Sequence, residues 1–267
     1  MTDNDKASQV DALDRQAQLA REEGRYEDAL RHLLAAFALA MAENQEKHVS
    51  VWHTILEWRF LVELYPPARV ALVQARDAQA CRVLAGDVVY GLPYSEYTPQ
   101  PSRFQLVERM NDILEDSRAT YALFVELDAR MPERARRESF VALPAVVEAG
   151  DFALGQRYLP DPLGFIDEVN RSAREWPLSP FVPASMRSFA NLSNYAKDLR
   201  LRAAIVRGLG REAEADALLE AGLAGLATDE LRDWVRQDLA SPGAILRLSS
   251  AQHMAYEDAR AHRTPGK

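Results

Sequence analysis

Apolar side chains recur at three- and four-residue steps along most of the chain, the spacing that places them on one face of a helix. Alternating apolar and polar positions, which indicate strands, are nearly absent. The pattern therefore predicts an all-α fold of stacked antiparallel helical hairpins. The expected helices cover about 6–23, 26–43, 46–64, 68–85, 102–125, 132–150 and 162–176, then 189–206, 215–226, one begun by Thr228 and a terminal one opened by Ser241 and Pro242.

Two of these helices have distinctive sequences. Apolar groups surround most of the segment 46–64, including Trp52 and Phe60, and a helix of this kind is usually central and buried. Ser102 and Gln105 have the spacing of a capping box, in which each side chain satisfies a free amide at the helix start. We expect one long amphipathic helix to follow this box.

The longest breaks in the helical pattern suggest how the chain is divided. A Pro-rich link at 177–183 is the expected boundary between an N-terminal region, 1–176, and a C-terminal region, 183–267. We expect the two regions to pack as one continuous solenoid. A long loop at 86–101 interrupts the N-terminal region.

Three short segments have the sequence of a tight corner between two helices. Each contains a glycine, which can adopt a positive φ without a Cβ clash. The segments are Glu23-Gly24-Arg25-Tyr26, Ala149-Gly150-Asp151-Phe152 and Leu209-Gly210-Arg211-Glu212.

The residues after the first corner resemble the tetratricopeptide repeat (TPR), a helix-turn-helix unit of about 34 residues. Gly24, Tyr26, Ala29 and Ala36 occupy the family's glycine, aromatic and small-residue positions. In the third copy Gly210, Ala215 and Gly222 do the same, although Glu212 replaces the aromatic. The corners are not spaced at the repeat length, so the resemblance implies an irregular, TPR-like α-solenoid.

The resemblance also implies which residues face a partner. Some TPR proteins grip a C-terminal carboxylate with Lys, Arg and Asn side chains on the inner helix, but the asparagines are missing here. What remains is an acidic inner face near the N-terminus and a basic one near the C-terminus. The candidate partner-binding residues are Asp14, Gln18 and Arg21 on the first face and Lys197, Arg200 and Arg207 on the second; an ordinary solvated surface is the alternative for both.

Composition narrows the classes of partner. The chain has 267 residues, a net charge of −8 and a sequence pI near 5.3. This balance disfavours nucleic acid or an anionic membrane and would steer a basic partner favourably. No apolar run approaches the ~20 residues that span a bilayer, so a cytoplasmic protein is expected. The single cysteine, Cys81, excludes an intramolecular disulfide, and we expect it to be buried and inert.

Few residues suggest catalysis or metal binding. His53 and Glu57 lie one helical turn apart and could share a metal, although a packed pair is the simpler interpretation. Glu108, Asp112 and Asp116 form an acidic stripe at four-residue steps, for which a salt-bridged surface is the simpler interpretation. Glycine-rich phosphate loops and nucleophile elbows are missing. The sequence therefore predicts no catalytic residue, cofactor or metal.

The loop at 86–101 is the most unusual candidate surface because it carries Tyr90, Tyr94 and Tyr97. A long tyrosine-bearing loop is often a binding element; alternatively, its rings fill a groove between helices. The leading prediction is a non-enzymatic scaffold that binds a protein or peptide. An acidic neutraliser of the immunity-protein or antitoxin type is one concrete version. The alternatives are an all-α enzyme or small-ligand pocket protein, possible through the carboxylates and His53, and a structural homodimer.

Overall fold

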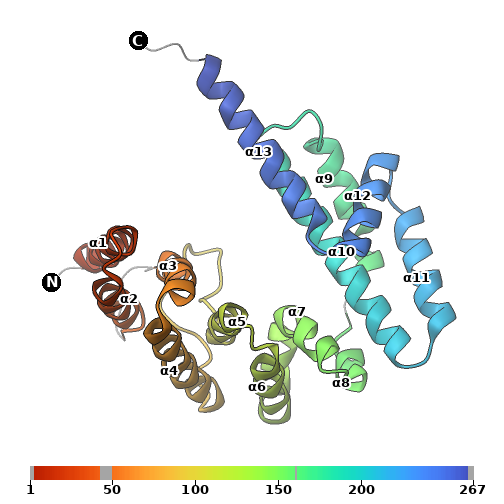
Figure 1. Ribbon diagram of the computed structural model, residues 1–267. Helices are drawn as coiled ribbons and strands as arrows, with labels where there is room; N and C mark the ends of the chain where they lie inside the picture. The colour runs from red at the N-terminus through yellow and green to blue at the C-terminus, as the bar shows by residue number, and fades with distance from the viewer. Residues whose placement is uncertain (1–2, 43–49, 160, 264–267) are drawn as a thin grey trace. The chain divides into compact units, whose positions relative to one another are not determined.

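The computed structural model describes residues 3–42, 50–159 and 161–263, and the regular elements in these ranges are thirteen α-helices and one 3-10 helix (Figure 1). The predicted all-α class is confirmed. In chain order the elements are α1 (Asp3–Glu22), α2 (Tyr26–Ala40), α3 (Trp52–Leu64), α4 (Pro66–Leu84), α5 (Arg103–Leu114), α6 (Ser117–Arg130), α7 (Pro132–Glu148), α8 (Phe152–Arg157), η1 (Pro162–Phe165), α9 (Ile166–Glu175), α10 (Ser185–Gly208), α11 (Glu212–Ala224), α12 (Asp229–Ala240) and α13 (Ala244–Arg263).

The long helix expected after Ser102 is in fact two helices. Helix α5 ends at Leu114, and Glu115 adopts a left-handed conformation with φ 56°. The Asp116 carboxylate then caps α6 by accepting a hydrogen bond from the Ala119 amide at 3.1 Å. Aspartate at an N-cap satisfies a free amide of the new helix, so the expected stripe of Glu108, Asp112 and Asp116 along one helix was wrong.

The predicted capping box is half right. The Ser102 hydroxyl accepts a hydrogen bond from the Gln105 amide at 3.3 Å. The Gln105 side chain does not return to Ser102 but donates from Nε2 to Oε2 of Glu138, at 3.2 Å. Helix α3 also begins later than expected, at Trp52; residues 46–49 of the expected helix lie outside the described residues.

The three glycine corners share one backbone geometry. Gly24, Gly150 and Gly210 have φ of 75°, 74° and 77°. At each corner the glycine amide donates to the carbonyl three residues earlier and the next amide donates to the carbonyl five residues earlier, with distances between 2.8 and 3.2 Å. This is the pattern that closes a helix with a left-handed residue. The sequence-based expectation of tight corners at these glycines is confirmed.

The contacts divide the chain into two compact units, 1–145 and 146–267. The division falls within α7, and the Pro-rich link 177–183 lies inside the second unit. In the first unit each helix from α1 to α6 packs against the next (Figure 1). Contacts also join α1 to α3, α3 to α5 and α4 to α6.

Trp58 anchors the core of the first unit. Its side chain is fully buried, and the indole Nε1 donates to the Ala68 carbonyl at 3.0 Å. The Phe37 ring packs edge-on against it, with centroids 5.7 Å apart. Small residues, including Ala17 and Ala29, are buried where α1 and α2 approach each other. This core fixes the position of α3 relative to its neighbours.

Helix α10 is the centre of the second unit and packs against α8, η1, α9, α11, α12 and α13. Its buried face includes Phe189, Leu192 and Leu199. The hydroxyl of the buried Tyr195 donates to the Gly222 carbonyl at 2.7 Å. Leu178 is 2% exposed, so the Pro-rich link contributes to this core.

Cys81 is exposed, contrary to the prediction that it is buried. No helix in the described ranges combines the length and the apolar character needed to cross a membrane.

Candidate functional site

The tyrosine loop, 86–101, is closed at its base by backbone contacts. The Tyr90 amide donates to the Pro101 carbonyl at 3.1 Å, and the Arg103 amide donates to the Val88 carbonyl at 3.0 Å. These bonds flank an isolated antiparallel bridge between Val89 and Ser102. The two ends of the loop are therefore held together where it leaves α4 and enters α5.

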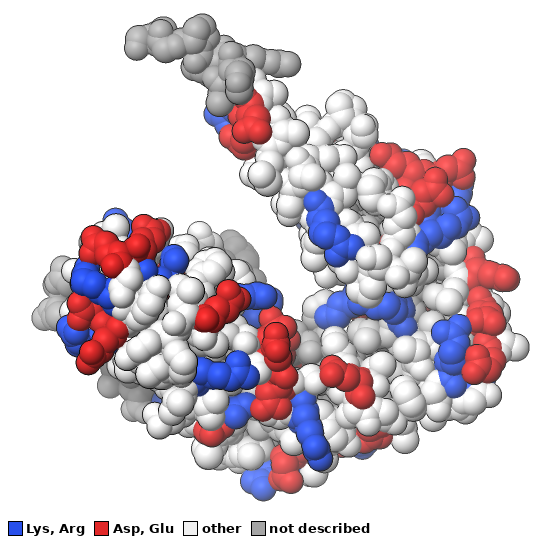
Figure 2. All heavy atoms as spheres, viewed as in Figure 1, with Lys and Arg blue, Asp and Glu red and all other residues white. Residues whose placement is uncertain are grey.

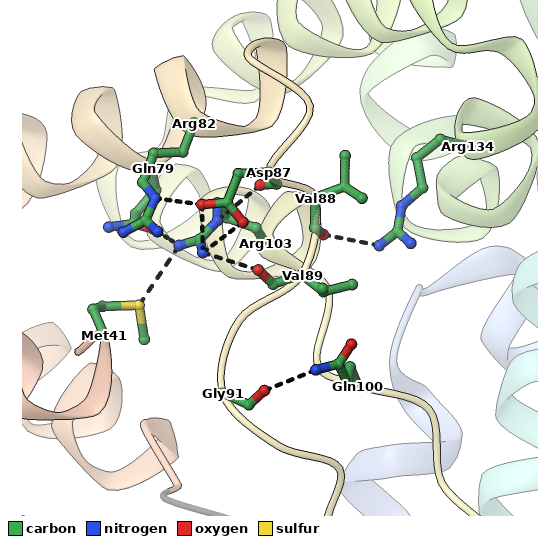
Figure 3. A network of polar contacts seen from close by, with 10 residues as sticks. All are labelled: Met41, Gln79, Arg82, Asp87, Val88, Val89, Gly91, Gln100, Arg103 and Arg134. Carbon is green, nitrogen blue, oxygen red and sulfur yellow. Dashed lines mark hydrogen bonds and ion pairs between the residues drawn. The ribbon is translucent and has the colours of Figure 1, made fainter. Parts of the chain in front are cut away.

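Arg103 braces this base from inside the first unit (Figure 3). Its guanidinium is 2% exposed and donates to the carbonyls of Asp87 and Val89, each at 2.9 Å. It also donates to the side chains of Asp87 and Gln79. Five donors in a fixed planar arrangement suit this role.

The charges at the base reinforce the brace. Burial alone would raise the pKa of Asp87, but hydrogen bonds from Arg82 and the charge of Arg103 outweigh it and hold the pKa below its usual value. Burial lowers the pKa of the Arg103 guanidinium, and the Asp87 carboxylate opposes this effect. A further donor, Arg134 of α7, binds the Val88 carbonyl at 3.0 Å (Figure 3).

Two more sets of hydrogen bonds order the outer part of the loop. Gln100 Nε2 donates across the loop to the Gly91 carbonyl at 3.0 Å (Figure 3). At the tip the Ser95 amide donates to the Thr98 hydroxyl at 2.9 Å, and the Thr98 amide donates to the Ser95 carbonyl at 3.1 Å. The loop is thus a structured turn from base to tip.

The three tyrosines of this loop have two different environments. Tyr90 is half-buried against the first unit's core, and burial raises the pKa of its hydroxyl to about 12, with Arg103 opposing the shift. Tyr94 and Tyr97 are 80% and 88% exposed. The groove-filling alternative therefore describes Tyr90, while Tyr94 and Tyr97 extend into solvent.

A groove between α1 and α3, the α1/α3 groove, brings together residues singled out separately in the sequence. It has a volume of about 350 Å³ and is lined by Asp11, Asp14, Arg15, Gln18, His53, Leu56 and Glu57. Asp14 and Gln18 come from the predicted acidic face, and His53 and Glu57 from the predicted metal pair. The structure places both pairs at one surface of the first unit.

Asp14 is the least accessible residue of this groove, at 6% exposure. Its carboxylate oxygens lie 2.8 and 3.1 Å from the Thr54 hydroxyl, the one hydrogen-bond donor to it among the residues the structure describes. Burial raises the pKa of Asp14 to about 6; Thr54 and His53 lower it, and Asp11 and Glu57 raise it further. Hydrogen bonds and nearby charges therefore offset only part of the free energy that the Asp14 carboxylate loses when it is removed from water.

Arg21 lies two helical turns beyond Asp14 on the same face of α1. Its Nε donates to Glu57 Oε2 at 3.0 Å, and its guanidinium stacks 5.1 Å from the Phe60 ring centroid. Gln18 donates to Glu22 at 3.0 Å. Arg21 and Gln18 are thus held in an ordered polar rim.

The sequence did not predict an apolar stripe on α3, the α3 stripe, in which Trp52 and Phe60 are exposed and Leu56 between them is half-buried. Trp52 is 53% and Phe60 42% exposed, so the expectation of a central, buried helix holds for the face with Trp58 but not for this one. Arg21 stacks on Phe60, while Arg109 of α5 lies 5.6 Å from the Trp52 ring centroid. The sequence did contain a signal for this exposure, because apolar residues surround most of α3 and a single core covers only part of a helix surface.

A second groove, between α3 and α5, extends this stripe to the base of the tyrosine loop. Its volume is about 280 Å³, and its lining includes Trp52, Arg109, Tyr90 and Pro101. The α1/α3 groove, the α3 stripe and the loop base therefore form neighbouring parts of one surface in the first unit.

The predicted basic face belongs to the second unit. Arg207 binds Asp216 at 2.7 Å and Glu212 at 3.2 Å. Arg200 lies 3.5 Å from the Asp238 carboxylate, and the Lys197 side chain is half-buried. At least two of these cations are thus paired with carboxylates of α11 and α12.

Other charged candidates are also paired or dispersed. Asp116 caps α6 and accepts from Arg76 at 3.2 Å. Within residues 3–42, 50–159 and 161–263, no group of three or more His, Cys, Asp and Glu side chains is placed to hold a metal ion. On the face shown in Figure 2, acidic and basic side chains are interspersed.

Comparisons of the chain with protein-family models, with curated proteins and with solved structures found no match.

Proposed function

We propose that this protein is a non-enzymatic scaffold that binds a protein partner through the tyrosine loop. The observation that carries the proposal is the exposure of Tyr94 and Tyr97 at the end of a loop whose base is fixed by a buried arginine. Tyrosine offers a large amphipathic contact area and loses little entropy on binding. An ordered loop also loses less entropy on association than a mobile one.

The helical arrangement supports a TPR-like α-solenoid as the framework of this scaffold. The three glycine corners share one conformation, and in the first unit contacts join successive helices from α1 to α6 and also α1 to α3, α3 to α5 and α4 to α6. Stacked helix pairs produce this contact pattern. With a net charge of −8, an acidic neutraliser of a basic partner, of the immunity-protein or antitoxin type, is the specific form that we propose.

The test is capture of partners from the native lysate, followed by rebinding of each purified candidate. The variant Tyr94→Ala/Tyr97→Ala should reduce affinity at least about tenfold, because tyrosine is enriched among the interface residues whose truncation costs about 2 kcal/mol or more. Its free energy of unfolding should stay within about 1 kcal/mol of wild type, because both rings are exposed.

Two matched variants make this test specific. Phe165→Ala removes another exposed aromatic ring, which lies in the second unit, and should leave binding unchanged. Tyr94→Phe/Tyr97→Phe keeps the ring area and should retain most of the affinity. Equal binding by wild type and the double alanine variant would refute the loop as the partner surface.

A further inference from the structure

The α1/α3 groove contains a carboxylate whose burial is only partly compensated. Asp14 is 6% exposed and accepts from one hydroxyl, that of Thr54. A carboxylate has capacity for about four hydrogen bonds, and taking it out of water without a counter-charge is costly. Asp14 nevertheless lines the groove, so a cation that enters the groove from outside the chain can reach it.

The adjoining α3 stripe offers apolar contact area beside this carboxylate. Trp52 and Phe60 are each about half exposed, and Leu56 lines both the stripe and the groove. Arg21 and Arg109 stack on the two rings and keep them in defined positions. Exposed aromatic rings ordered by arginines are typical of the energetically important part of a protein interface.

We propose that this surface docks a peptide segment of the partner that carries an arginine or lysine next to an apolar side chain. The basic group enters the α1/α3 groove and binds Asp14, with Asp11 and Glu57 at the rim, and the apolar side chain packs on the α3 stripe. The cation offsets the desolvation of Asp14, so the buried carboxylate provides selectivity as well as affinity.

The charges around the groove favour a cationic occupant over an anionic one. The groove lining contains three acidic residues, Asp11, Asp14 and Glu57, and two basic ones, Arg15 and His53. The guanidinium of Arg21 already binds Glu57 at the rim and does not reach the floor at Asp14 through any hydrogen bond that the described residues show. An anionic peptide would meet the poorly compensated carboxylate and be repelled.

This inference rests on the proposed function in one respect, since it treats the first unit as a partner-binding surface. It concerns different residues from the tyrosine loop, and its test needs no identified partner. The double alanine variant of Tyr94 and Tyr97 should keep the selectivity for basic peptides, so failure of one proposal can be distinguished from failure of the other.

The experiment screens the full-length protein against an immobilised library of capped octapeptides. The fourth position is fixed as arginine, as its neutral analogue citrulline, or as glutamate; the fifth is leucine and the others are randomised. We expect arginine peptides to be retained over both other sets. For the best arginine peptide, anisotropy should show affinity about tenfold or more above its citrulline counterpart.

Two variants test the assigned contacts. Asp14→Asn keeps an acceptor for Thr54 and should abolish the preference for arginine over citrulline. Trp52→Ala should weaken both peptides by a similar factor, because it removes apolar area common to the two. Glu63→Gln, which changes net charge by the same amount as Asp14→Asn at an exposed position of α3 outside the groove lining, should keep the preference.

A measurement on the wild type guards against misfolding of a variant. Titration with N-acetylarginine amide should shift the backbone resonances of α1 and α3 around Asp14 and His53, and N-acetylcitrulline amide should not. An equal response to the two compounds, an arginine preference unaffected by Asp14→Asn, or no retention of arginine peptides over glutamate peptides would overturn the proposal.

Discussion

Replacing Asp14 with asparagine should stabilise the protein at neutral pH. The carboxylate is buried at the floor of the α1/α3 groove, and burial raises its pKa from 3.8 to about 6. One pKa unit corresponds to about 1.4 kcal/mol, so the shift represents up to about 3 kcal/mol of unfavourable free energy in the ionised folded state. Water in the open groove reduces this value, and we expect a gain of about 1–3 kcal/mol.

The effect should depend on pH with a defined sign. Because the folded pKa is the higher one, the folded protein binds this proton more tightly than the unfolded chain does between pH 3.8 and about 6. The contribution of protonated Asp14 to the free energy of unfolding is fully present below pH 3.8 and is lost as pH rises to about 6. Asp14→Asn should therefore match wild type near pH 4 and exceed it increasingly up to pH 6, with a constant difference above.

Chemical denaturation of both proteins at pH 4, 5, 6 and 8 would measure this difference. Asp11→Asn is the matched control, because it removes the same charge from an exposed position of the same helix; its effect should stay within about 0.5 kcal/mol. A destabilised Asp14→Asn at pH 8, or a difference that does not change with pH, would refute the account of Asp14 as an undercompensated carboxylate. A stability gain that accompanies lost peptide selectivity would identify a trade-off between stability and binding.

Three further substitutions test the framework. Arg103→Met should lower the free energy of unfolding by about 3–5 kcal/mol in urea denaturation, because the Asp87 and Val89 carbonyls and the buried Gln79 side chain lose their donor. Hydrogen exchange at the Tyr90 amide should become faster, and unchanged exchange would contradict the role of Arg103 at the loop base. Gly24→Val should lower the free energy of unfolding by about 1–3 kcal/mol, because a β-branched residue is strained at φ 75°. Gly24→Asn should lower it less, and equal losses for the two variants would argue against backbone strain. Gly222→Ala should lower the thermal midpoint, because the added Cβ would lie 2.8 Å from both Leu199 methyl carbons. An unchanged midpoint would show that α10 and α11 can move apart enough to accommodate the added methyl group.

The positions of most helices were readable from local sequence. Glycines at 24, 150 and 210 mark corners because few other residues adopt their φ without strain, and such rules act over a few residues. The break at Glu115 was missed because a left-handed glutamate leaves no comparable signal, and its stabilising contacts come from Asp116 and Arg76.

The candidate site was only partly predictable, because pairing across helices is a tertiary property. The sequence drew attention to Asp14 and Gln18, to His53 and Glu57, and to the tyrosines, each for a local reason. It gave no indication that the first four residues line one groove, or that Arg103 would brace the loop from a buried position. Helical periodicity identified the apolar residues of α3 but not which of them lacked a covering neighbour.

Because the base of the tyrosine loop is closed, changes at its tip can alter binding without disturbing the packing of the helices around it. Hydrogen bonds from Arg103, and the bridge between Val89 and Ser102, hold the loop ends together independently of residues 92–99. Lengthening a loop whose ends are already joined costs little, because closure entropy grows only slowly with length. The segment 92–99 is therefore suited to insertion and grafting, and new recognition sequences can be exchanged there, by natural divergence or by engineering, without redesigning the helices.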